Sequence, residues 1–145
     1  MNRIFITGFT VIILACSTTG AYGRQEKPPA ATSVTPASLD FGEQVAKSAS
    51  KPQRVTVTNT GGKDLYINSV AVGGDNHQDF VMKGDTCTGA TLAASKSCVV
   101  DVIFQPTVTE SRRATLVITT GAADSPQRVV LTGTGINSVD VPPRK

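Results

Sequence analysis

Apolar and polar residues alternate in the segment from Gln53 to Gly62. Residues 55–58 read Val-Thr-Val-Thr, which is the period-2 pattern of a strand with one buried face and one solvated face. Residues 59–62, Asn-Thr-Gly-Gly, then end the strand, because Asn and Gly accept the positive φ that a reversing chain needs. The next run, Asp64–Val72, is again strand-like. The pattern therefore predicts a β-hairpin here.

Similar short runs, separated by turn residues, continue along the chain, and none has helical periodicity. The first run contains Pro36, which cannot donate to a ladder, so we expect a broken strand at a sheet edge. Seven strands at this spacing predict an all-β fold, an immunoglobulin-like antiparallel two-sheet sandwich. An up-and-down barrel is the alternative, but the long crossing loops favour Greek-key connections. The expected strands are residues 35–42, 53–58, 65–72, 79–83, 98–104, 114–119 and 129–131.

The pattern also predicts the register of the last two strands. Inward residues must face inward residues, because a slip of one residue turns every side chain to the opposite face. Folding symmetrically about residues 123–124 leaves Gly121 and Ser125-Pro126 in the loop. The small Ala114–Gly133 pair leaves room at one end of the sandwich for Phe104 or Phe41. The expected pairs are Ile118 with Val129, Leu116 with Leu131, Ala114 with Gly133 and, on the outer face, Val117 with Val130 and Thr115 with Thr132.

Residues 1–15 contain Arg3 followed by an apolar run, Ile4–Ala15. The run is too short to span a bilayer, so it predicts a cleavable export signal. Two cleavage sites compete. Residues 13–16, Ile-Leu-Ala-Cys, resemble a bacterial lipoprotein box with Cys16 as the acylated residue, whereas residues 21–23, Ala-Tyr-Gly, favour ordinary cleavage after Gly23.

The rest of the chain divides by composition. Residues 16–33 are rich in Pro and Ala near their end and are expected to be a semi-extended linker. The folded domain is expected at residues 34–135, followed by a polar tail at 136–145. A length of 145 residues and a hydrophobic content of 39% allow one core of this size.

The chain has three cysteines. If Cys16 is acylated, Cys87 and Cys98 remain as one pair, and they are also present after cleavage at Gly23. An oxidising compartment permits a disulfide between them. We therefore expect a Cys87–Cys98 bond in an exported protein, either in the bacterial cell envelope or secreted.

Composition excludes several functions. The net charge is +3 and the basic residues are dispersed, which disfavours nucleic-acid binding. Trp is absent and Tyr occurs twice, which disfavours an aromatic sugar-binding platform. His77, the single histidine, lies in an expected loop, so neither catalysis nor a transition-metal site is predicted.

Oxygen-bearing side chains gather between residues 75 and 85, at Asp75, Asn76, Asp79 and Asp85. They are ligands of the type that Ca²⁺ prefers, but their spacing does not match an EF-hand loop. Asp and Asn in loops more often cap turns with their own backbone. We therefore expect no cofactor.

Apolar residues also occur at positions of the last strands that are expected to be solvated. Such residues on an outer face can mark a partner surface, although scattered exposed valines are common in sheets. The candidate interaction face consists of Val99, Ile103, Val117 and Val130.

Several short motifs, taken in order, resemble a known family. The chain is similar to the bacterial choice-of-anchor D proteins, relatives of the ASH (Hydin-like) domains, over about residues 34–135. The resemblance implies an immunoglobulin-like sandwich used for scaffolding or protein–protein contact, and it implies no catalytic residues. The residues that carry it are Leu39-Asp40-Phe41-Gly42, Val55-x-Val57-x-Asn59-Thr60-Gly61, Asp79-Phe80, Cys87, Leu92, Ser97-Cys98-x-Val100-x-Val102-x-Phe104-x-Pro106, Ala114-x-Leu116-x-Ile118 and Leu131-x-Gly133-x-Gly135.

Two functions fit these observations. The first is a non-catalytic structural or protein-interaction module of the cell envelope, with another envelope or extracellular protein as its partner and a lipid anchor as its link to the membrane. The alternative is a periplasmic chaperone-like sandwich that binds an extended strand of a client.

Overall fold

The computed structural model describes residues 26–140, which form an all-β domain. The predictions for residues 1–25, including the acylated Cys16, and for residues 141–145 concern residues outside the described part. Two 3₁₀ turns, η1 (His77–Asp79) and η2 (Ser138–Asp140), accompany nine strands. The strands are β1 (Thr32–Thr35), β2 (Ser38–Val45), β3 (Gln53–Asn59), β4 (Leu65–Gly73), β5 (Phe80–Asp85), β6 (Thr91–Leu92), β7 (Ser97–Phe104), β8 (Ser111–Thr120) and β9 (Gln127–Ile136).

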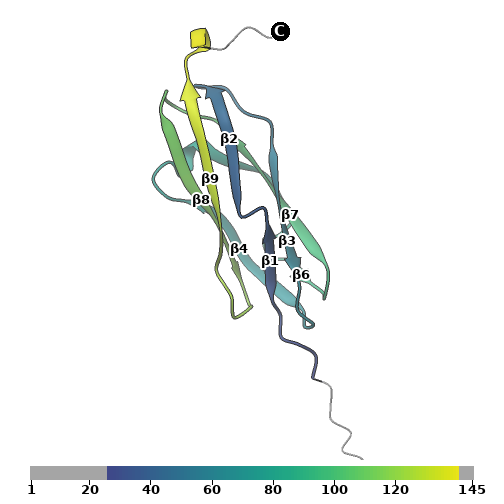
Figure 1. Cartoon of the computed structure of the whole chain (residues 1–145). Coiled ribbons are helices and arrows are strands. Elements are labelled where there is room, and N and C mark those ends of the chain that lie inside the picture. The colour runs from purple at the N-terminus through teal and green to yellow at the C-terminus, as the bar shows by residue number, and fades with distance from the viewer. Residues whose placement is uncertain (1–25, 141–145) are drawn as a thin grey trace, which may run out of the picture.

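The strands form two sheets packed as a sandwich (Figure 1). Sheet A has the order β1-β3-β7-β5, and sheet B has the order β2-β9-β8-β4-β6. All pairs are antiparallel except β2 with β9, which run parallel. The expected immunoglobulin-like sandwich is confirmed, with this one parallel pair as a correction to its antiparallel description.

Nine strands replace the expected seven for two reasons. The broken strand expected at residues 35–42 is two strands, because the chain leaves sheet A after Thr35 and enters sheet B at Ser38. The two-residue strand β6 is too short to show periodicity, and it pairs Leu92 with Leu65 at the beginning of β4.

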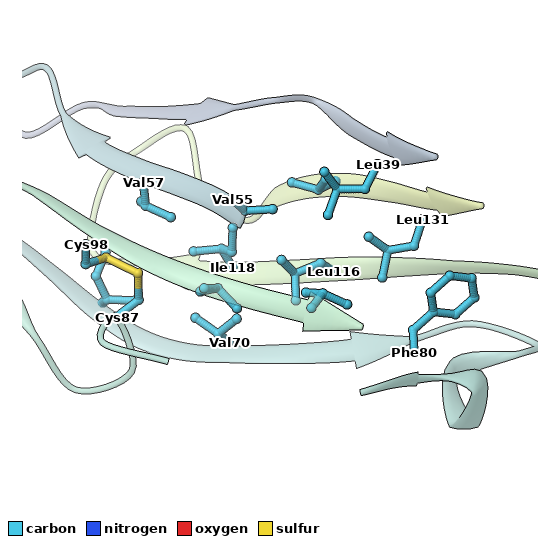
Figure 2. Packing of buried hydrophobic residues seen from close by; sticks show 14 of the residues in the cluster. Leu39, Val55, Val57, Val70, Phe80, Cys87, Cys98, Leu116, Ile118 and Leu131 are labelled. Carbon is cyan, nitrogen blue, oxygen red and sulfur yellow. A yellow bond between two sulfur atoms is a disulfide. The ribbon is translucent and has the colours of Figure 1, made fainter. Parts of the chain in front are cut away.

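The core lies between the sheets and is built from the inward residues of both (Figure 2). Most side chains of the core come from alternate positions of a strand, as the alternation predicts. The exceptions include Cys87, which lies in a loop, and Val70, which follows an irregularity in β4. Its centre is formed by fully buried residues of five strands: Val55, Val57, Ile67, Val100, Val102, Leu116, Ile118, Val129 and Leu131.

The Cys87–Cys98 disulfide is present and lies at the edge of this core (Figure 2). The two Cα atoms are 5.1 Å apart, and both side chains are buried. The bond joins the loop after β5 to the beginning of β7. It closes a loop of 11 residues, for which loop-closure entropy gives about 2–3 kcal/mol.

The predicted register of the last hairpin is wrong by two residues. Ile118 pairs with Gln127, Leu116 with Val129, Ala114 with Leu131 and Thr115 with Val130. Val117 accordingly faces Arg128 in place of the expected Val130. Because the shift is even, the inward assignment survives: residues 114, 116, 118, 129, 131 and 133 are all buried.

Gly133 lies directly against the ring of Phe104. A Cβ atom at this position would lie 2.5 Å from Cε1 of Phe104 and 2.7 Å from its Cδ1. Phe104 in turn contacts Phe80, with ring centroids 4.8 Å apart, and Phe41, at 5.9 Å. The absent side chain at Gly133 thus leaves the space that was expected for an aromatic residue.

The segment before β1 contacts the domain. The amide of Gly62 donates to the carbonyl of Pro28 at 3.1 Å, and the amide of Thr60 donates to the carbonyl of Ala31 at 3.0 Å. A Cβ atom at Gly61 or Gly62 would collide with this segment. Ordered contacts therefore begin near Pro28, before the expected domain start at Val34.

Gly133→Ala tests the contact with Phe104. The added methyl group must displace the ring, and overpacking of this kind costs about 1–3 kcal/mol. Gly73→Ala is the matched control, because Gly73 also lies in sheet B but a Cβ atom there meets nothing within 4 Å. Urea unfolding should show a lower free energy of unfolding for Gly133→Ala only. Equal stabilities of the two variants would contradict the contact between Gly133 and Phe104.

Candidate functional site

The candidate interaction face is divided between the two sides of the sandwich. Val99 and Ile103 belong to β7 in sheet A, whereas Val117 and Val130 belong to β8 and β9 in sheet B. Ile103 is only 4% exposed. The prediction that these four residues form one face is therefore wrong, because alternation says which residues point outward but not from which sheet.

On the outer face of sheet A, charged groups are paired within the molecule. Arg54 of β3 is the cross-strand partner of Asp101 of β7, and its Nε and Nη2 atoms donate to the two carboxylate oxygens at 2.8 and 3.0 Å. These hydrogen bonds hold the pKa of Asp101 below its usual value. The hydroxyl groups of Thr58 and Ser97 also bond to each other, at 2.7 Å.

The outer face of sheet B has a different character, and we call it the sheet B face. Its central row runs Ser38, Val130, Thr115 across β2, β9 and β8. The next row runs Asp40, Thr132, Arg113 across the same strands. Uncharged small or β-branched side chains thus lie beside a row with opposite charges at its two ends.

The backbone around the two charged residues is firmly held. The chain has an irregularity in β2 between Asp40 and Glu43, where Gly42 has φ 63° and its amide donates to Oδ1 of Asp40 at 2.9 Å. On the other side, the amide of Arg113 donates to Oδ1 of Asn76 at 2.9 Å. Hydrogen bonds therefore fix the backbone that positions the Asp40 and Arg113 side chains.

Within the described residues 26–140, Asp40 and Arg113 do not pair with each other or with another side chain. They line an open hollow of about 370 Å³ together with Ser111, Thr132 and Thr134. The ion pairs found within residues 26–140 involve neither residue. Sequence reasoning missed both, although Asp40 alternates with buried Leu39 and Arg113 with buried Ala114, which indicates that they point outward.

Three of the four oxygen-bearing residues considered for calcium, Asn76, Asp79 and Asp85, are engaged with the protein. Asp79 is 1% exposed and forms an ion pair with Nε of Arg112, and it also accepts from the amide of Thr107 at 3.2 Å. Asn76 bonds to the backbone of Arg113. Within residues 26–140, no group of three or more His, Cys, Asp or Glu side chains is placed to hold a metal ion.

Asp85 organises the disulfide loop. Its carboxylate accepts the amides of Cys87 at 2.7 Å and Thr88 at 3.1 Å, and it also accepts the Thr88 hydroxyl. Partial burial raises the pKa of Asp85, but the bonds from the Thr88 hydroxyl and the two amides outweigh it, so the pKa lies below its usual value. Asp85 therefore has a structural role as a turn cap.

His77 is exposed in η1, with Nδ1 2.9 Å from the carbonyl oxygen of Gly74. This contact fixes the ring against its own turn.

No helix in the described residues is long and apolar enough to cross a membrane.

Comparison with known proteins identifies relatives of this sandwich. Residues 30–135 match the family model described as HYDIN/CFA65/VesB-like, Ig-like domain. PapD-like domain 7 of human CEP192, an ASH / PapD-like domain, superposes with a TM-score of 0.57 at 12% identity, covering 94% of this chain and 99% of that one. No curated protein sequence matches the chain.

Two bacterial structures share the fold over part of their length. The periplasmic chaperone SfaE has a TM-score of 0.55 at 16% identity, covering 78% of this chain and 61% of SfaE. The VesB protease of Vibrio cholerae has a TM-score of 0.52 at 18% identity, covering 73% of this chain and 32% of VesB. The chain thus spans less than two thirds of either protein, and at these identities the likeness establishes the fold alone.

The cap at Asp85 predicts a specific pH dependence. Because the folded-state pKa lies below the unfolded value of about 3.9, the carboxylate stabilises the fold above that pH, and this contribution is lost as the pH falls through the folded-state pKa. Asp85→Asn should therefore be less stable than the parent at pH 7 and approach it in acid. Urea titrations from pH 7 to 2.5 measure the difference, and a difference that does not change with pH would contradict the assignment.

Proposed function

Since the chain belongs to the HYDIN/CFA65/VesB-like family of Ig-like domains, we propose that it is a non-catalytic protein-interaction module of the bacterial cell envelope. Its partner is a protein of the same compartment, bound on the sheet B face. The observation that carries this proposal is the pair Asp40 and Arg113, whose opposite charges flank an uncharged row of side chains.

The composition of the sheet B face supports the proposal. Protein interfaces have cores depleted of charge and rims that are polar. Val130 and Thr115 provide an uncharged, half-buried centre, while Asp40 and Arg113 lie beside it. Charged groups at such positions give specificity and orientation when a partner supplies the complementary charges.

Export is the second part of the proposal. The Cys87–Cys98 disulfide supports an oxidising compartment, either periplasmic or extracellular. We further propose cleavage before Cys16 and acylation of this residue, because a diacylated cysteine gives firm membrane anchoring.

Intact mass of the mature protein should show the added lipid; an unmodified chain that begins at Arg24 would disprove the anchor but leave the export proposal in place.

Strand capture, as in a chaperone, is the second candidate, and the fold shared with SfaE favours it. The outermost strands of the described sheets argue against it. β1 and β6 have four and two residues, and β2 and β5 contain irregularities at Asp40/Glu43 and Met82/Gly84. Short or bulged edges prevent the addition of a further strand. Residues 69–73 of β4 are the remaining stretch where a client strand would have to bind.

Site-specific photo-crosslinking in the producing cells tests the sheet B face. A photoreactive amino acid in place of Val130 should give adducts with protein. The same substitution at Val99 is the matched control, because this residue is also a half-buried valine but lies on the outer face of sheet A. Equal yields at the two positions, or adducts at Val99 alone, would disprove the proposed face.

A further inference from the structure

We propose that the partner on the sheet B face is a second copy of this chain, packed face to face about a two-fold axis that follows β9 through Thr132. This inference rests on the proposed function, and it names the partner. It follows from the register of β2, β9 and β8, which places Asp40 and Arg113 on opposite sides of Thr132 in one row.

The row is complementary to itself. Neighbouring strands lie about 4.8 Å apart, so Asp40 and Arg113 flank Thr132 at nearly equal distances. A two-fold axis along β9 interchanges the β2 and β8 sides of the two copies. It therefore brings Asp40 of each copy opposite Arg113 of the other, and both charges gain a partner that residues 26–140 of one chain do not provide.

The neighbouring rows fit the same axis. Val130 meets its own counterpart, and Ser38 meets Thr115 of the second copy. On the other side, Glu43 is in register with Thr134, and Thr134 pairs with Ser111, so the axis brings Glu43 opposite Ser111 of the second copy, one row from the second Arg113. The hollow of about 370 Å³ over Thr132 and Thr134 provides the space for the side chains of the second copy.

Arg128 also lies on β9, two residues before Val130. It would meet its own counterpart if β9 lay parallel to the two-fold axis over its whole length. Sheets that pack face to face cross at about −30° because each is twisted. The two β9 strands therefore diverge away from the Val130–Thr132 crossing, and the Arg128 side chains extend to solvent at the rim. Their repulsion is screened there by salt.

The size of the face predicts a weak dimer. β8 and β9 have ten residues each. The other two strands of this face, β2 and β4, have eight and nine. Together the four strands give a footprint of about 600 Å² per copy. Stable interfaces bury about 800 Å² per partner, so the association belongs to the lower end of the range. The measurement must therefore extend to high micromolar concentrations.

Charge reversal distinguishes a two-fold face from any other partner. Asp40→Arg places two arginines on the row, and Arg113→Asp places two carboxylates there. Each variant alone should be at least tenfold weaker as a homodimer, measured by sedimentation velocity on the purified mature protein. An equimolar mixture of the two variants should restore dimers, because every position then faces the opposite charge. Mixing that restores nothing would overturn the proposal.

Further variants separate association from folding. Asp40→Asn removes the charge but keeps the oxygen that accepts the Gly42 amide, so it should weaken the dimer without a change in melting temperature. Val99→Glu, on sheet A, should leave association unchanged. A parent protein that stays monomeric at several hundred micromolar would also overturn the inference.

The photo-crosslinking experiment separates this inference from the proposed function. An adduct at Val130 with twice the mass of the chain supports both. An adduct with a different protein, without self-adducts, supports the interaction module and overturns the dimer. No adduct at Val130 overturns both.

Discussion

The close approach of Gly133 and Phe104 determines how the two sheets meet at one end of the sandwich. Because Gly133 has no side chain, the Phe104 ring of sheet A lies directly against β9 of sheet B. Phe80 and Phe41 then gather around Phe104, at centroid distances of 4.8 and 5.9 Å. Aromatic contacts of this kind add to the burial of the rings and close the core.

The same contact is linked to a buried ion pair. Arg112 of β8 is the cross-strand partner of Gly133 and points inward, where it meets Asp79, the residue before Phe80. Breaking such a pair by removing one partner typically costs about 3–5 kcal/mol, because the other charge stays buried. The 3₁₀ turn η1 is thereby joined to β8, and the adjacent Asn76 bonds to the backbone of Arg113. The position of Arg113 on the sheet B face thus depends on packing at the end of the core.

The sequence predicted the faces of the strands well and their pairing less well. Alternation with period 2 identifies Leu116, Ile118, Val129 and Leu131 as inward, and all four are fully buried. Their register depends on the loop at residues 121–126, where the amide of Thr120 donates to the Ser125 hydroxyl and β9 begins at Gln127, two residues before the expected start. Hydrogen bonds of this kind leave no periodic signal, so symmetric folding missed the register by two residues.

The candidate site was harder to predict because it depends on which strands are neighbours. Val117 and Val130 were correctly assigned to an outer face, but Val99 and Ile103 belong to the other sheet. The row that includes Asp40 exists only because β2 crosses to sheet B and runs parallel to β9. Such a pairing joins residues about 90 positions apart, and alternation within one strand carries no information about it.

The geometry of the sandwich also explains why a face, and not an edge, is the surface suited to association. An exposed strand edge offers unpaired backbone groups to any other strand, so edge pairing can continue from copy to copy. The described edges are mostly short or irregular, which opposes this. A face whose opposite charges are interchanged by a two-fold axis is different. Each copy pairs with the charges of the other, and the assembly stops at a dimer. On sheet A, Arg54 and Asp101 already satisfy each other, and a second copy would gain nothing there. In the proposed dimer, the charges of Asp40 and Arg113, which have no ion-pair partner within residues 26–140, thus both select the face and limit the number of copies that it joins.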